Sequence, residues 1–191
     1  MIAREFANHG WAVKIADLDI SQGTSFKWRS RRLQSGLEPD VPVEMFGSVK
    51  KALEDGNHYD LLVIDGAPHA TEATKEAAKA SDLIIIPTGL SVDDLEPTVL
   101  LAHELAKLID HDRIVFTLSR VGSSSAEVEE GRAYLERAGY KVLGGELPDQ
   151  VGYRRAIDEG RTVTETRFAS LNQKADQVAQ AIMDKLAGLT G

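Results

Sequence analysis

Cysteine is absent from all 191 residues, so the chain can form no disulfide and offers no thiolate to a metal ion. It also lacks any apolar run that approaches the roughly 18 residues of a membrane span. Its first residues do not show the pattern of a signal peptide. We therefore expect a soluble, cytoplasmic protein with no membrane partner.

Positive charge is also scarce, because 22 basic residues stand against 30 acidic ones and the net charge is −8. This balance argues against a chain coated for nucleic acid, although local basic patches remain possible. Hydrophobic residues make up 42% of the chain, which is enough for a sizeable core. The length suits one domain, and we expect residues 1–191 to form it.

Helical and strand patterns alternate along the whole chain, and three of the helices are closed by Gly10, Gly56 and Gly139 before a strand begins. The expected strands are 12–17, 41–46, 61–64, 83–87, 114–118 and 141–147. The expected helices are 1–9, 24–35, 48–55, 70–80, 91–109, 124–139, a short one after residue 149, and 169–186. Such an alternation predicts an α/β fold with a mainly parallel β-sheet and helices on both faces.

Two of these helices carry a capping box at their start. Ser91 is followed three residues later by Asp94, and Ser124 is followed by Glu127. We expect each serine side chain to bind the backbone N–H three residues on.

The stretch from Tyr59 to His69, YDLLVIDGAPH, organises the rest of the chain. Its apolar run 61–64 has no polar alternation, which predicts a strand buried on both faces. Asp65 then lies at the carboxyl end of this strand, where open α/β sheets place their ligand sites. The alternative is an aspartate that only starts a turn at Gly66 and Pro68.

A second pair of acids follows the strand 12–17. Asp17 and Asp19 are two residues apart, so their side chains leave a strand end on the same side. A solvated acidic turn is the alternative. Acids at two neighbouring strand ends suit a hydrated Mg²⁺, which favours one or two carboxylates together with phosphate oxygens.

Four segments, in order and spread over residues 1–168, resemble the ParA/MinD family of partitioning ATPases. ADLDISQGTS (16–25) resembles the switch segment of that family, and YDLLVIDGAP (59–68) resembles its Walker B strand. The segment 80–98 resembles the stretch that follows Walker B, and VGYRRAIDEGRTVTE (151–165) resembles the C-terminal part of the shorter ParA proteins. The resemblance implies a P-loop NTPase architecture.

The resemblance also implies ATP and Mg²⁺ as cofactors and assigns roles to the acids. Asp17 would lie beside the Mg²⁺ and its waters, Asp19 would orient the attacking water, and Asp65 would hold a Mg²⁺-bound water from the other side. Ser119 stands where the family often has asparagine, which weakens a contact to the base. The further nucleotide-binding residues that the resemblance implies are Gln22, Ser119, Arg120, Pro148, Asp149 and Gln150.

One defining element of the family is missing, because no G-x-x-x-x-G-K-[ST] pattern occurs in the sequence. The chain begins with what resembles the helix after that loop, so the first strand of the architecture is also missing. Without such a loop we expect poor ATP binding and a hydrolysis rate lower by about 10³-fold. We also expect a gap beside the Asp65 strand. A late start codon, a fragment, and a gap filled by another segment or subunit all remain open explanations.

Two groups of basic residues are candidates for contact with DNA phosphates or a partner. A solvated helix face is the alternative reading. By resemblance, we expect an ATP-dependent homodimer that binds DNA non-specifically on the nucleoid and works with a ParB-like partner. The first group is Lys27, Arg29, Arg31 and Arg32, beside Trp28; the second is Arg154, Arg155, Arg161, Arg167 and Lys174.

Three functions are consistent with the sequence. The first is a ParA-like ATPase of plasmid or chromosome partitioning. The second, which the missing loop favours, is a non-catalytic DNA- or partner-binding module on the same fold. The third is a receiver-like domain built on the Asp17/Asp19 pair, Asp65 and Thr88, against which stand the Ser-Arg after strand 114–118 and the length of the chain.

Overall fold

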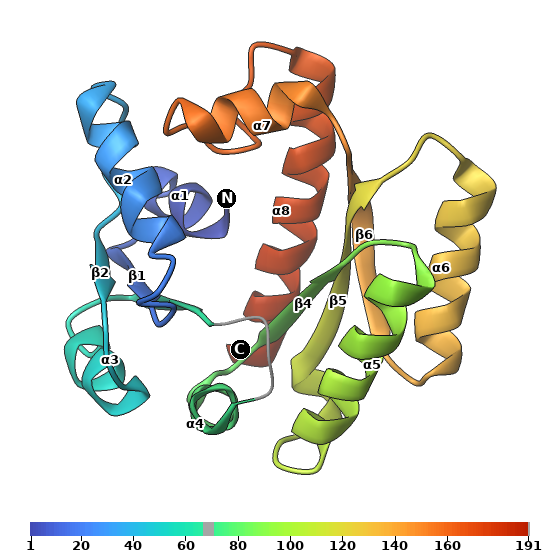
Figure 1. Ribbon diagram of the computed structural model, residues 1–191. Helices are drawn as coiled ribbons and strands as arrows, with labels where there is room; N and C mark the ends of the chain where they lie inside the picture. The colour runs from blue at the N-terminus through green and yellow to red at the C-terminus, as the bar shows by residue number, and fades with distance from the viewer. Residues whose placement is uncertain (67–70, 191) are drawn as a thin grey trace. The chain divides into compact units, whose positions relative to one another are not determined.

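The computed structural model describes residues 1–66 and 71–190 and shows the expected alternation of strands and helices (Figure 1). The six strands are β1 (Val13–Asp17), β2 (Val43–Met45), β3 (Leu61–Asp65), β4 (Ile84–Thr88), β5 (Ile114–Val121) and β6 (Lys141–Pro148). The α-helices are α1 (Ile2–Asn8), α2 (Thr24–Gln34), α3 (Val49–Gly56), α4 (Glu72–Ala80), α5 (Val92–Ala106), α6 (Ser125–Arg137), α7 (Val151–Asp158) and α8 (Ala169–Thr190). A 3₁₀ turn, η1 (His111–Arg113), precedes β5.

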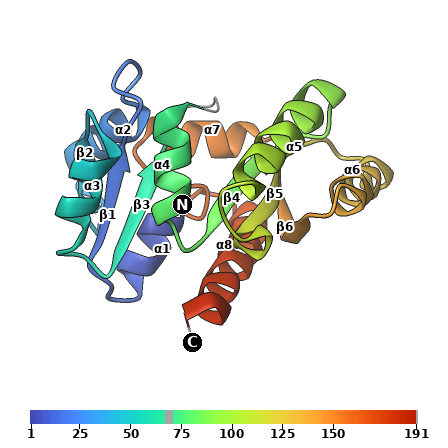
Figure 2. The same cartoon turned by 90° about the horizontal axis from the view of Figure 1, so that it is seen from below.

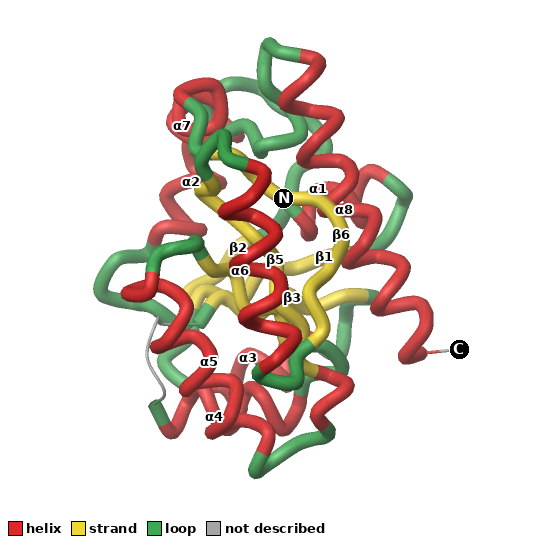
Figure 3. Tube along the Cα trace, turned by 90° about the vertical axis from the view of Figure 1, so that its right-hand side faces the viewer, coloured by secondary structure: helices red, strands yellow, loops and turns green. Residues whose placement is uncertain are grey.

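The α/β fold class is confirmed, because both sheets are parallel and helices alternate with the strands along the chain (Figure 3). The end of the organising stretch, Ala67 to His69, lies outside the described residues. Across the residues that are described, no helix is long and apolar enough to cross a membrane.

By its internal contacts the chain divides into two compact units. Unit 1 comprises Met1–Ala77 and Gly152–Leu171, and unit 2 comprises Ala78–Val151 and Asn172–Gly191. Whether residues 1–191 act as a single domain stays a prediction.

Unit 1 contains a parallel sheet of order β2-β1-β3 (Figure 2). The register between β1 and β3 runs from Val13↔Leu61 to Asp17↔Asp65. Side chains alternate between the faces of a strand, so Lys14 and Ala16 share a face with Leu62. Helix α3 covers that face and α1 lies on the opposite side of the sheet (Figure 2).

The helix-covered face holds a buried lysine. Lys14 in β1 donates from Nζ to Glu44 at 2.6 Å and to Asp55 at 2.5 Å, and the ring of Phe46 lies 5.3 Å away. Burial opposes the charge on this amine, but the two carboxylates outweigh that effect and raise the pKa of Lys14. The lysine therefore stays charged and ties β1 to β2 and α3.

Unit 2 contains a second parallel sheet of order β4-β5-β6, with α5 and α6 on one side and α8 on the other (Figure 1). Its core gathers apolar side chains of β4, β5, α5 and α6 around Phe116, Leu118 and Leu135, which are fully buried. Both expected serine caps are confirmed, because the backbone N–H groups of Asp94 and Glu127 donate to the hydroxyl oxygens of Ser91 and Ser124 at 3.2 and 3.3 Å. The caps fix where α5 and α6 begin.

The prediction that strand 61–64 is buried on both faces is wrong, since every residue of β3 is only half-buried. In β4, Ile84 and Ile85 are likewise half-buried and Pro87 is exposed. Both strands lie at an end of their sheets, and in the described part of the chain no strand pairs with the outer side of either. The outer edge of β3 is therefore open, in agreement with the gap expected beside the Asp65 strand.

Two hydrogen bonds show which backbone groups of β3 face outward. Leu61 N–H donates to Ala12 O at 3.2 Å, and Leu18 N–H donates to Asp65 O at 2.9 Å. Because the N–H and C=O groups of successive residues in a strand alternate in direction, Val63 also faces β1. The N–H and C=O groups of Leu62 and Ile64 therefore lie on the open edge.

This alternation is tested by a pair of proline variants. Val63→Pro removes an N–H that faces β1 and leaves a β1 carbonyl unpaired, whereas Ile64→Pro removes an N–H on the open edge. We expect the free energy of unfolding of Val63→Pro to be lower than that of Ile64→Pro by about 1–3 kcal/mol. Urea unfolding of the two variants measures this difference, and an equal or reversed loss would contradict the assigned edge.

Candidate functional site

The carboxyl ends of β1 and β3 bring two of the predicted site residues together. Asp17 and Asp65 are register partners on adjacent parallel strands, so their side chains leave the sheet on the same face. Neighbouring strands lie about 4.8 Å apart, which places the two acids side by side. The sequence prediction that acids from two strands meet here agrees with this geometry.

Asp17 itself is fully buried, and both of its oxygens bind the turn that leads into α2. Oδ1 accepts from Asp19 N–H at 3.1 Å, and Oδ2 accepts from Phe26 N–H at 3.2 Å. Phe26 lies in the first turn of α2, where free N–H groups and the helix dipole stabilise a negative charge. In this conformation Asp17 shapes the turn, and its carboxylate has no exposed face for the metal ion that the resemblance assigns to it.

Asp65 is more open. The described residues give its carboxylate one hydrogen bond, from the Ser25 hydroxyl to Oδ2 at 2.6 Å. Asp65 is half-buried, and the residue after it, Gly66, is exposed. Asp65 is thus the acid of the register pair that is accessible to a ligand.

Asp19 bonds within its own turn. Its Oδ1 accepts from the Ser21 hydroxyl at 2.6 Å and from Gln22 N–H at 3.2 Å, and the bond from Ser21 is the main cause of a lowered pKa for Asp19. Gln22 is exposed in the same turn. Asp19 therefore stays ionised at neutral pH, at the mouth of the turn beside Asp17.

The donor set fits a hydrated magnesium ion better than a closed metal cage. Over residues 1–66 and 71–190, no group of three or more histidine, cysteine, aspartate or glutamate side chains is arranged to hold a metal. Mg²⁺ keeps several waters and uses one or two carboxylates in nucleotide sites, so the half-buried carboxylate of Asp65 is compatible with such an ion. Such an ion would supply charge neutralisation for phosphate oxygens.

The predicted base-binding residues form a second group, at the carboxyl ends of β5 and β6 in unit 2. Ser119 pairs in register with Leu147, and Asp149 N–H donates to Val121 O at 2.9 Å. Pro148 ends β6, and Asp149 and Gln150 lie exposed in the loop to α7. The structure brings these residues together at the carboxyl ends of two neighbouring strands. Their contact with the base of a nucleotide stays a prediction.

Arg120 is held in an unusual conformation at that edge. Its φ of 57° is the one positive value among the non-glycine residues described, and its guanidinium lies 3.4 Å from Asp94 Oδ1. A left-handed backbone conformation costs free energy for any residue with a side chain, and such strain concentrates at ligand-binding positions. The pairing of β5 with β6 shifts register at this point, between Ser119 and Val121, and the Arg120 side chain is exposed.

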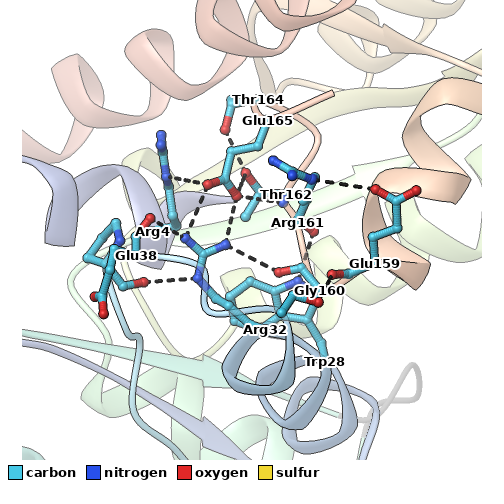
Figure 4. A network of polar contacts seen from close by, with 12 residues as sticks. Arg4, Trp28, Arg32, Glu38, Glu159, Gly160, Arg161, Thr162, Thr164 and Glu165 are labelled. Carbon is cyan, nitrogen blue, oxygen red and sulfur yellow. Dashed lines mark hydrogen bonds and ion pairs between the residues drawn. The ribbon is translucent and has the colours of Figure 1, made fainter. Parts of the chain in front are cut away.

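The expected DNA-binding role of Arg32 is wrong, because this side chain is fully buried. Its guanidinium donates to both oxygens of Glu165 at 2.8 and 3.1 Å and to the carbonyl oxygens of Glu38, Pro39 and Gly160 (Figure 4). A side chain with all these partners inside the protein has no donor to offer to a DNA phosphate.

The Arg32–Glu165 pair belongs to a larger buried network that joins α1, α2 and the segment 160–166 (Figure 4). Arg4 reaches Glu165 at 3.3 Å, Thr162 N–H donates to Glu165 at 2.8 Å, and Thr164 donates to the buried Glu5 at 2.5 Å. Gly160 has a φ of 78°, and a Cβ there would collide with the α2 backbone at Arg32. Only glycine allows this close approach.

Other members of the first basic group are also engaged in unit 1. Arg29 makes a two-pronged pair with Asp40 at 2.8 and 3.1 Å, which raises the pKa of Arg29 and lowers that of Asp40. Lys27 donates to Gln22 O at 2.6 Å, and Arg31 donates to Ile157 O at 3.4 Å. The basic side chains of α2 therefore mainly hold this helix to neighbouring segments of unit 1.

The second basic group is more open. Arg154 and Arg155 are exposed on α7, while Arg161 and Arg167 lie 3.5 and 3.3 Å from Glu159. Lys174, on α8 in unit 2, lies 3.9 Å from Glu146. In unit 1, the exposed arginines of α7 are therefore the best-placed candidates for phosphate contacts.

The sequence did not predict two of these contacts, Ser25–Asp65 and Arg32–Glu165. Their partners are 40 and 133 residues apart, and no spacing rule joins residues at such distances. The available signals were weak: a serine just after the acidic turn and one glutamate in the segment that resembles the ParA C-terminal stretch.

Similarity to known proteins is found at the level of the fold. No family model matches the sequence, and no curated protein does either. The MinD cell division protein of Aquifex aeolicus superposes with a TM-score of 0.69 at 14% identity, over 96% of this chain and 89% of that one. The Pyrococcus furiosus cell division ATPase MinD gives 0.70 at 14% identity, over 96% and 90%. A putative plasmid partition protein of Borrelia burgdorferi bound to AMPPNP gives 0.70 at 15% identity, over 96% and 91%.

The buried network gives a pH-dependent prediction. Burial alone would raise the pKa of Glu165, but the hydrogen bonds from Arg32 and from the Thr162 N–H outweigh it and lower the pKa. A lowered pKa in the folded state stabilises the protein above the ordinary glutamate pKa of 4.5, and this stability is lost as the pH falls through the folded value. We expect Glu165→Gln to lower the free energy of unfolding at pH 7 by about 3 kcal/mol or more.

As the pH falls from 5 to 3, Glu165 of the wild type becomes protonated and its contribution to stability is lost, whereas the variant has no carboxyl group at this position. The difference in the free energy of unfolding between the wild type and Glu165→Gln should therefore shrink over this range. Urea unfolding across this range measures the effect, with the exposed Glu159→Gln as the matched control. A deficit for Glu165→Gln that stays constant with pH would contradict the assigned pair.

Proposed function

We propose that this chain, which has the ParA/MinD fold, is a ParA-like ATPase domain of plasmid or chromosome partitioning. The observation that carries the proposal is the register pair Asp17 and Asp65 at the carboxyl ends of β1 and β3, followed by the turn that contains Asp19. The neighbours of known structure are named as a cell division ATPase, as a plasmid partition protein bound to AMPPNP and as a McdA–ATP complex. At 13–15% identity these neighbours support the fold, and the site residues support the chemistry.

In this proposal the chain's own residues position the reactants. Asp65 presents a carboxylate to a hydrated Mg²⁺, Asp17 holds the turn in shape, and Asp19 accepts a hydrogen bond from the attacking water. When bound, the Mg²⁺ supplies neutralisation of the phosphate charge. Phosphoryl transfer needs this kind of positioning and charge neutralisation more than covalent catalysis.

The proposal includes a weak nucleotide site in this chain. The sequence contains no glycine-rich lysine loop, so no backbone N–H cradle and no lysine of that kind face the phosphates. The alternative function, a non-catalytic DNA- or partner-binding module, is supported by the same absence. Nucleotide binding separates the two.

We also propose that the protein acts as an ATP-dependent homodimer, binds DNA non-specifically and works with a ParB-like partner. One neighbour is named as a MinC:MinD complex, which is a partner interaction of that protein. In this chain, Arg154 and Arg155 on the exposed side of α7 support contact with phosphates.

Titration with labelled ATP and Mg²⁺ tests the nucleotide proposal. We expect saturable binding with a Kd of roughly millimolar, or about −4 kcal/mol, because the carboxylate edge is present and the phosphate loop is not. Binding in the micromolar range would overturn the proposed weakness. No saturable binding at all would favour the non-catalytic module.

Asp19→Ala tests the assigned role of the turn. We expect the variant to bind Mg²⁺–ATP as the wild type does and to lose at least tenfold in the single-turnover hydrolysis rate, since Asp19 contributes to orienting water. Ile20→Ala, at an exposed residue of the same turn, is the matched control for a disturbed backbone. Equal hydrolysis rates for Asp19→Ala and the wild type would remove this role.

Charge reversal on α7 tests the DNA proposal. Arg154→Glu with Arg155→Glu should weaken binding to a random-sequence duplex and reduce the slope of log Kd against log salt by about two units. The matched control is Lys50→Glu with Lys51→Glu on the exposed part of α3. If both double variants bind DNA equally, the α7 surface is not the site.

A further inference from the structure

The contact between Ser25 and Asp65 links two segments that are 40 residues apart. Ser25 lies in the first turn of α2, and its hydroxyl donates to Asp65 Oδ2 at 2.6 Å. A serine at such a position commonly bonds a nearby backbone group of its own helix. Here it reaches instead to the end of β3.

Because of this bond, the two carboxylate oxygens of Asp65 differ in their hydrogen bonding. Oδ2 is committed to Ser25, and the described residues place no donor on Oδ1. Asp17, the register partner, has both oxygens committed to backbone N–H groups and is fully buried. Of the four oxygens of the pair, Oδ1 of Asp65 is therefore the one to which the described residues give no hydrogen bond.

The helix that carries Ser25 is itself held in unit 1 by contacts along its length. At its start, Phe26 N–H donates to Asp17. Further along, Trp28 Nε1 donates to Arg161 O at 2.9 Å, and Arg32 binds Glu165. The Ser25 hydroxyl is thus presented from a fixed support rather than from a loose turn.

We propose that Ser25 is a positioning residue, which orients the Asp65 carboxylate so that its second oxygen faces the divalent cation of the site. This inference rests on the proposed function, since the cation belongs to the ATPase reading of the site. Partners that orient a metal-binding side chain typically contribute 10- to 100-fold to metal affinity, without touching the metal.

The experiment uses Mn²⁺ as a paramagnetic probe of the cation site in the full chain. Mn²⁺ broadens the NMR signals of nearby amides, and the titration midpoint at Gly66 reports the affinity. We expect Ser25→Ala to raise this midpoint by about tenfold or more. Ser25→Thr keeps the hydroxyl and should restore the wild-type midpoint, while Ser21→Ala removes the hydroxyl that serves Asp19 and should change it less.

A second readout needs no ligand. Native-state amide exchange at Phe26 and Lys27, whose N–H groups donate to Asp17 and to Gly23 O, should be faster in Ser25→Ala than in the wild type, Ser25→Thr or Ser21→Ala, because the tether to β3 is lost. Urea unfolding of each variant confirms that it is folded. Unchanged exchange in Ser25→Ala would refute the tether.

The outcomes separate this inference from the proposed function. Mn²⁺ binding near Gly66 that is equal in the wild type and Ser25→Ala would refute the role of Ser25 and leave the magnesium site standing. No broadening near Gly66 in the wild type at millimolar Mn²⁺ would refute the magnesium site, and with it the positioning role. Weaker binding by Ser25→Ala that Ser25→Thr restores would support both.

Discussion

The parallel register between β1 and β3 is the constraint on which the candidate site depends. It aligns Asp17 with Asp65 on one face of the sheet, so that two acids distant in the sequence become neighbours at one strand edge. The same alignment brings Leu18 N–H to Asp65 O, which fixes where β1 ends and the acidic turn begins. A slip of one residue would send one of the two acids to the opposite face, and the site would no longer exist.

Burial then gives the two acids different tasks. Asp17 is buried and accepts hydrogen bonds from two backbone N–H groups, so it stabilises the turn, while the described residues bond only one oxygen of Asp65. Helix α2 connects this edge to the buried pair of Arg32 and Glu165 on the segment 160–166. A buried ion pair adds little net stability compared with well-packed apolar residues, but breaking it is costly, so it holds one arrangement of α2 in preference to others.

Local rules predicted much of the fold. Alternating apolar runs and glycines gave the order of the elements, and the serines at 91 and 124 gave the starts of α5 and α6. The meeting of Asp17 and Asp65 also followed, because parallel strands end at a common edge. The burial of Arg32 did not follow, because a run of basic residues on a helix looks like a solvated face until a glutamate 133 residues away is brought to it. The apolar run of β3 wrongly predicted burial on both faces, since such a run does not reveal how many neighbours cover a strand, whereas the missing phosphate loop and first strand predicted the gap beside it.

The most direct test of the register is native-state amide hydrogen exchange along β1 and β3, followed residue by residue by NMR. The structure requires slow exchange at Leu18 and Val63, whose N–H groups lie between the two strands, and fast exchange at Ile64, whose N–H lies on the open edge. Slow exchange at Ile64 together with fast exchange at Val63 would mean that the strand is paired one residue out of this register, and the neighbouring carboxylates would be lost with it.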